Sequence, residues 1–71
     1  MPFSYKMDRR MALRLLNSFP TKVRTTNGKE YTTKPSIEGT KIYVEGYKRP
    51  IKVKQITKIQ YKDIFMEVDW E

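Results

Sequence analysis

The stretch KVRTTNGKEYTT, residues 22–33, decides the fold because it predicts a β-hairpin. Residues with strand propensity stand on both sides of Asn27-Gly28, the dipeptide most typical of a two-residue type I′ turn. Side chains alternate between the two faces of a strand, so Lys22 and Arg24 share one face. That face is either a binding surface or the hydrated side of a sheet, and the pattern alone leaves both open.

A helix precedes the hairpin. Asp8 or Ser4 can cap its N-terminus, and Pro20 ends it because the residue before a proline is pushed out of the α region. We expect the helix over about residues 6–18, with its apolar stripe covering the core and part of the stripe facing another chain as the alternative. The stripe, at helical spacing, consists of Met7, Met11, Ala12, Leu15, Leu16 and Phe19.

After the hairpin the two-residue periodicity continues. Lys34-Pro35-Ser36 breaks the second strand or moves it to an edge, and KIYVE, residues 41–45, forms the next strand. The string IKVKQITKIQY, residues 51–61, predicts a strand, a short helical turn near Gln55-Thr57 and a further strand. Lys62-Asp63 predicts a tight turn. In the last segment the alternation directs inward Ile64, Met66, Val68 and Trp70.

These elements resemble a small SH3-like barrel with an N-terminal helix, as found in Sm-like proteins and the bacterial YolD-like family. The resemblance rests on Asn27-Gly28, on Gly39 before KIYV, and on the spacing within IKVKQITKI. The sequence therefore predicts an α+β fold: an N-terminal helix packed on a small antiparallel SH3-like β-barrel of five to six short strands. Residues 1–71 form a single domain, with the barrel over about residues 21–70.

Composition excludes most catalytic chemistry. The chain has no histidine and no cysteine, which removes the commonest general base, the commonest metal ligand and the thiolate nucleophile. Its three glycines match no phosphate-binding loop. Glu67, Asp69 and Glu71 are expected on a hydrated strand face, which does not shift a carboxylate toward acid–base catalysis. We therefore expect no enzymatic activity, no cofactor and no metal site.

The positive charge favours a polyanionic partner. Fifteen basic and eight acidic residues give a net charge of +7. Residues 1–35 hold eight basic and two acidic groups, a net charge of +6. The hypothesis is a surface that binds nucleic acid through its phosphate backbone, with aromatic rings to stack on bases. The expected contact residues are Lys22, Arg24, Lys41, Tyr43, Tyr47, Lys48, Arg49, Lys52 and Lys54.

Lysines on the outer face of a small sheet also keep a protein soluble, and this explanation stays open. The alternative function is a protein–protein interaction module, a small accessory or inhibitor protein of the kind that phages and mobile elements carry. It would dock on a larger protein through the helix margin and the C-terminal strand. The expected contact residues are then Met11, Leu13, Phe65 and Trp70.

The sequence predicts a cytoplasmic protein. No apolar run approaches the length of about 20 residues that spans a bilayer, and the N-terminus lacks the apolar region of a secretory signal. The absence of cysteine fits a reducing compartment. We expect no membrane partner, and a homo-oligomer is a third option, implied only by the Sm-like resemblance.

Overall fold

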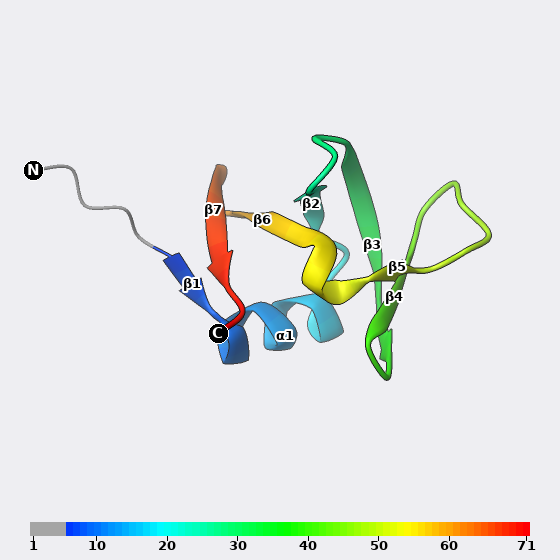
Figure 1. The fold of residues 1–71 in the computed structure, drawn as a ribbon, viewed down its shortest axis with the longest axis horizontal. Helices are drawn as coiled ribbons and strands as arrows, with labels where there is room; N and C mark the ends of the chain where they lie inside the picture. Colours follow the sequence, from blue (N-terminus) through cyan, green and yellow to red (C-terminus); the bar gives the residue numbers. More distant parts are fainter. Residues whose placement is uncertain (1–5) are drawn as a thin grey trace, which may run out of the picture.

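A computed structural model describes residues 6–71, which form an α+β fold with one helix and a seven-stranded sheet (Figure 1). The elements in chain order are β1 (Lys6–Asp8), α1 (Arg9–Ser18), β2 (Lys22–Thr25), β3 (Glu30–Glu38), β4 (Lys41–Val44), β5 (Ile51–Lys52), the 3-10 turn η1 (Val53–Gln55), β6 (Ile56–Tyr61) and β7 (Ile64–Asp69). The predicted α+β class and the N-terminal helix are confirmed. Ser4, one of the two predicted helix caps, lies outside the described residues.

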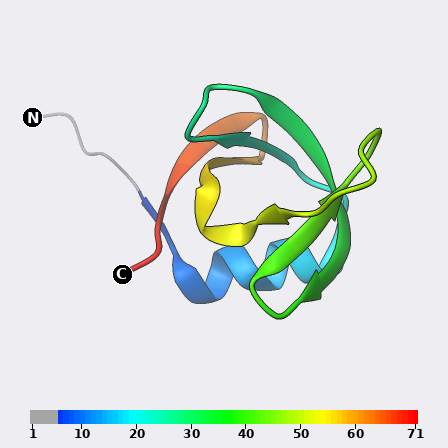
Figure 2. The ribbon, with the colours of Figure 1, turned by 45° about the vertical axis from the view of Figure 1, so that its right-hand side comes forward.

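The sheet has the strand order β1-β7-β6-β2-β3-β4-β5 and is open, with β1 and β5 at its two edges. Neighbouring strands are antiparallel except for β1 and β7, which run parallel. The prediction of five to six antiparallel strands is therefore wrong on both counts, because β1 adds a parallel edge strand. The sheet curls strongly, and α1 lies below it and contacts β1, β3 and β7 (Figure 2).

The helix begins at Arg9 and not at residue 6. Asp8 has extended backbone, and its Oδ1 accepts a hydrogen bond from the Met11 N–H at 2.8 Å. An N-cap residue is non-helical by definition, so the chain before it is free to pair as a strand. Met7 is fully buried there and faces Val68 of β7 in the register. Met7 was predicted in the helix because a buried apolar residue at this position fits both a helix and a strand.

The turn at Asn27-Gly28 connects β2 to β3, but it is not type I′. Gly28 has a φ of +79°, whereas Asn27 does not have a positive φ. The Gly28 N–H donates to the Thr25 carbonyl at 2.9 Å, and the Thr25 N–H donates to the Lys29 carbonyl at 3.1 Å. This is the pattern of a three-residue loop closed by a left-handed glycine. The hairpin is confirmed, and its predicted turn type is wrong.

The stretch 51–61 contains the predicted strand, short helical turn and second strand, but the turn is Val53–Gln55 and not Gln55-Thr57, and Thr57 belongs to β6. The turn at Lys62-Asp63 is also confirmed, and both residues have positive φ, +51° and +67°. Positive φ at both central residues is the type I′ geometry that the sequence predicted elsewhere. Tyr61 and Ile64 pair directly across this turn.

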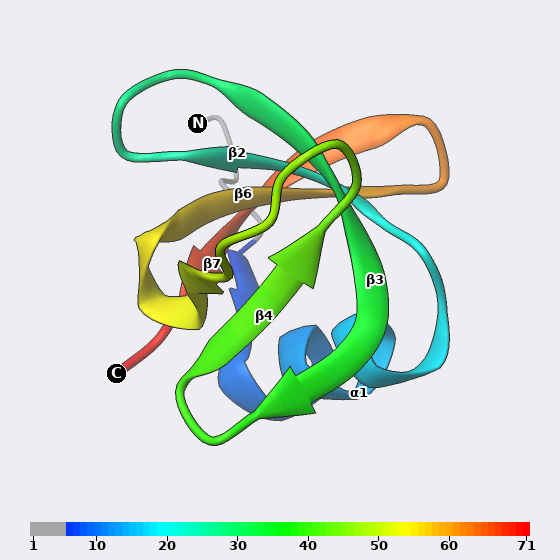
Figure 3. The ribbon, with the colours of Figure 1, turned by 90° about the vertical axis from the view of Figure 1, so that its right-hand side faces the viewer.

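β3 carries the chain from one half of the sheet to the other (Figure 3). Its first residues pair with β2, and its later residues pair with β4. The register shifts between Thr33 and Ile37, around Pro35, which has no N–H to donate to a ladder. Pro35 therefore interrupts the regular pairing of β3 but does not end the strand, which continues to Glu38.

The core lies between the curled sheet and α1. Its buried apolar side chains are Met7, Ala12, Leu16, Val23, Ile42, Val44, Val53, Ile56 and Ile59. Two residues expected in the core are exposed, Phe19 at 60% and Ile64 at 59%. Phe19 follows the last helical residue and has extended backbone, so helical periodicity no longer sets its direction. Ile64 is adjacent to the β6–β7 turn.

Candidate nucleic-acid interface

The nine residues predicted to contact nucleic acid do not form one continuous face. Lys22 and Arg24 lie on β2, within the half of the sheet formed with β6 and β7. The others belong to the β4–β5 hairpin and the turn after it: Lys41, Tyr43, Tyr47, Lys48, Arg49, Lys52 and Lys54. β3 separates the two groups, because one part of it pairs with β2 and another with β4.

Arg24 is engaged within the protein. Its Nε lies 3.6 Å from Oε1 of Glu30, and its guanidinium carbon lies 4.1 Å from the centroid of the Phe65 ring. Phe65, predicted for a partner interface, is thus half-buried beneath Arg24. A cation that is already paired and stacked must give up these contacts before it can bind a phosphate.

The outer face around Arg24 carries mixed charge. One row of register partners crosses five strands of the sheet. The row consists of Lys6, Glu67, Lys58, Arg24 and Glu30. Two carboxylates among three cations give only a weak net positive charge. The positive surface predicted from the alternation of β2 therefore does not extend across β6 and β7.

The β4–β5 hairpin concentrates charge of one sign. Residues 41–54 hold five basic residues and a single acidic residue, Glu45, a net charge of +4. Lys41 and Lys52 are direct register partners, and Lys48 and Arg49 lie in the loop that projects away from the sheet (Figure 1). We refer to these exposed side chains as the hairpin cations: Lys41, Lys48, Arg49, Lys52 and Lys54.

The hairpin cations have no carboxylate within 4.0 Å among residues 6–71, where the ion pair found is Arg24–Glu30. The loop that carries two of them is fastened at its base. The Glu45 N–H donates to the Thr32 carbonyl at 2.8 Å, and Tyr47 packs edge-on against Tyr31 with ring centroids 5.2 Å apart. Tyr47 is still 56% exposed, and Tyr43 is half-buried.

A groove of about 410 Å³ lies beside Lys22, between the end of α1 and the β6–β7 turn. Phe19 and Tyr61 contribute aromatic rings to it, and the Lys62 Nζ lies 5.4 Å from the Tyr61 ring centroid. The complete lining is Leu15, Phe19, Pro20, Thr21, Lys22, Thr32, Gln60, Tyr61 and Lys62. Phe19 was predicted in the core, and neither Tyr61 nor Lys62 was among the predicted site residues. Pro20 was the available signal, because the residue before it leaves the helix.

The four residues of the alternative partner surface do not form one surface, although two of them, Leu13 and Trp70, lie together. Leu13 and Trp70 line a small pocket of about 130 Å³ with Val53, rimmed by Arg9 and Lys54. The indole is held there, because its Nε1–H donates to the Ile56 carbonyl at 2.7 Å. Met11 packs against the core from α1, and Phe65 lies on the outer face of the sheet beneath the Arg24 guanidinium.

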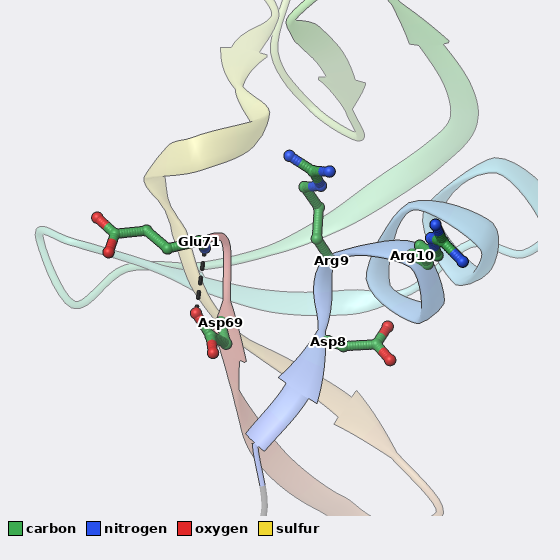
Figure 4. Close-up of a pocket in the computed structure, with 5 residues that line it drawn as sticks. All are labelled: Asp8, Arg9, Arg10, Asp69 and Glu71. Atoms are coloured by element: carbon green, nitrogen blue, oxygen red, sulfur yellow. Dashed lines mark hydrogen bonds between the residues drawn. The ribbon is translucent and has the colours of Figure 1, made fainter.

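A further hollow, of about 510 Å³, separates the start of α1 from the C-terminal residues (Figure 4). Asp69 and Glu71 lie on one side of it, and Asp8, Arg9 and Arg10 on the other. Oδ1 of Asp8 accepts from a helix N–H, and Oδ1 of Asp69 accepts from the Glu71 N–H at 3.1 Å. Two of the three carboxylates thus accept hydrogen bonds from nearby backbone N–H groups. Three carboxylates and two arginines line the hollow, so its charge is nearly balanced.

Within residues 6–71, α1 is neither long nor apolar enough to cross a membrane. Comparison with protein-family models, with curated proteins and with solved structures gave no match.

Proposed function

We propose that this protein is a non-enzymatic nucleic-acid-binding module, and that the hairpin cations are its main contact surface. The observation that supports this most directly is the gathering of five exposed cations without a carboxylate within 4.0 Å in the described residues. Phosphate-backbone binding needs long cationic side chains that are spread over a surface and not already paired. The exposed ring of Tyr47 adds a surface on which a base can stack.

The hairpin is preferred over β2 because of what surrounds each group. Arg24 is paired with Glu30 and stacked on Phe65, and its row carries two carboxylates. The hairpin has one acidic residue, Glu45, among its five cations. Its loop is fixed at the base and projects at the tip, which allows Lys48 and Arg49 to reach a ligand without a rearrangement of the sheet.

We also infer that the unit formed by β2 to β6 is a small SH3-like barrel. The order β6-β2-β3-β4-β5, with a 3-10 turn between β5 and β6, supports this assignment. β7 and β1 then extend the sheet beyond β6, and α1 covers the core from one side. Small barrels host many unrelated activities, so this inference concerns the fold alone. The lack of cysteine fits a cytoplasmic location.

Salt dependence tests the proposed function. Fluorescence anisotropy would follow short labelled single-stranded and duplex oligonucleotides at two salt concentrations. If all five hairpin cations neutralise phosphates, the log–log slope is about −4.5, and affinity for duplex falls about 500-fold between about 50 and 200 mM salt. Absence of binding at low salt, or affinity that does not change with salt, would contradict the proposal.

A matched pair of variants tests the location. Lys48→Glu with Arg49→Glu reverses two hairpin charges, and Arg10→Glu with Lys29→Glu reverses two exposed charges elsewhere. Each pair lowers the formal net charge by four, from +7 to +3. We expect the hairpin pair to weaken binding more than tenfold and to reduce the slope by about 2, and the control pair to act much less. Equal losses would assign binding to net charge and not to the hairpin.

A further inference from the structure

Phe19 is fixed in an exposed position. The residue is 60% exposed although it directly follows α1, which packs on the core. The Phe19 N–H donates to the Leu15 carbonyl at 3.0 Å, and the Phe19 carbonyl accepts from the Thr21 hydroxyl at 2.9 Å. The backbone on both sides of Phe19 is therefore held, which fixes the position from which the side chain extends into the groove lining. A group ordered in advance loses little conformational entropy when a ligand binds.

The rest of the groove offers the chemistry that complements a nucleotide. Phe19 and the half-buried Tyr61 provide aromatic surface, and Gln60 provides an amide with both donors and an acceptor. Lys22 and Lys62 provide positive charge at the rim. The volume of about 410 Å³ lies within the range of about 300–1,000 Å³ typical of small-ligand sites. No acidic residue is among those that line this groove.

We propose that this groove binds one unstacked base of a single-stranded nucleic acid, with the base against Phe19 and the flanking phosphates near Lys22 and Lys62. The inference rests on the proposed function and adds a preference for single strands. Bases within a duplex stack on one another, and only a single strand presents a free base face to an aromatic ring. Charge complementarity favours this occupant over an apolar peptide, because an apolar peptide has no negative charge to pair with Lys22 and Lys62.

The groove adjoins the hairpin through Thr32. Thr32 lines the groove beside its register partner Lys22, and its carbonyl accepts from the Glu45 N–H where the β4–β5 loop begins. A strand whose base occupies the groove can therefore continue toward Lys48 and Arg49. The two sites contribute differently to the binding free energy: the groove through base stacking, and the hairpin through neutralisation of phosphates.

The test compares two exposed apolar residues. Phe19 and Ile64 are almost equally exposed, at 60% and 59%, but only Phe19 is among the residues that line the groove. Anisotropy would measure labelled oligo-dT and a labelled duplex of the same length. We expect Phe19→Ala to weaken oligo-dT binding about 5- to 150-fold, the equivalent of about 1–3 kcal/mol per stacked base. Duplex affinity should stay within about twofold, and Ile64→Ala should change neither.

Further arms separate the possible outcomes. Phe19→Tyr keeps the ring and should keep the oligo-dT affinity, and the thermal midpoint of each variant checks that it folds. If Phe19→Ala leaves oligo-dT binding intact while Lys48→Glu with Arg49→Glu abolishes it, the base site is wrong and the proposed function stands. If the wild type binds neither oligonucleotide, both are wrong. If sedimentation shows that Phe19→Ala disrupts a dimer without a selective loss of oligo-dT binding, the ring covers a second copy of this chain instead.

Discussion

Replacement of Thr33 by valine should destabilise the protein by about 1–3 kcal/mol, because it leaves a buried N–H without a partner. The Thr33 side chain is fully buried. Its hydroxyl accepts from the Thr21 N–H and donates to the Thr21 carbonyl, each at 3.2 Å. After the change the Thr21 carbonyl still accepts from the Thr33 N–H at 2.9 Å, whereas the Thr21 N–H loses the hydroxyl. Valine has a similar shape, so cavity formation adds little.

This loss is a substantial fraction of the total stability of such a domain, which is about 4–10 kcal/mol for 71 residues. It corresponds to a decrease of about 5–20 °C in the thermal midpoint, measured by circular dichroism. Thr32→Val is the matched control, because Thr32 is half-buried and its hydroxyl makes no hydrogen bond to the described residues. We expect that control to stay within about 0.5 kcal/mol of the wild type. Equal destabilisation of the two variants would refute the reasoning.

Three further stability predictions use urea unfolding. Asp8→Ala should remove about 0.5–2 kcal/mol because it deletes the helix cap, and Asp8→Asn should retain most of the stability. Gly28→Ala should cost about 1–2 kcal/mol from left-handed backbone strain alone, since open space surrounds the position, and an unchanged midpoint would contradict this. A double-mutant cycle of Arg24→Ala and Phe65→Ala should give a coupling of about 0.5–1 kcal/mol, and zero coupling would show that the stacking contributes nothing.

Local patterns predicted the elements well where neighbours in the chain determine them. The strand, turn and strand over residues 51–61 follow from the spacing of apolar residues, and the turn at Lys62-Asp63 follows from its composition. β1 could not be predicted this way, because three residues carry little periodicity and its partner, β7, is almost the whole described chain away. Phe19 was assigned to the core because helical spacing was extended one residue beyond the helix.

The candidate site was partly accessible from the sequence. Strand alternation correctly indicates that Lys22, Lys41 and Lys52 are exposed. Their division into two groups depends on the register shift in β3, which no local pattern specifies. The contact of Arg24 with Phe65 reaches across β6, so it depends on the register of three strands. The groove combines α1, β2, β3 and the β6–β7 turn, and only the assembled fold places these side by side.

The parallel pairing of β1 with β7 has a consequence for the order in which the chain folds. Lys6 faces Glu67, 61 positions later (67 − 6), so this ladder closes the longest loop in the described fold. Its closure entropy is about 4 kcal/mol, far more than that of the two-residue turn between β6 and β7. On the ribosome, β1 has no strand to join until residues 64–69 have emerged from the exit tunnel. We therefore expect the β2–β3 and β4–β5 hairpins to form before the β1–β7 ladder, and the buried side chain of Met7 to dock only after β7 is in place.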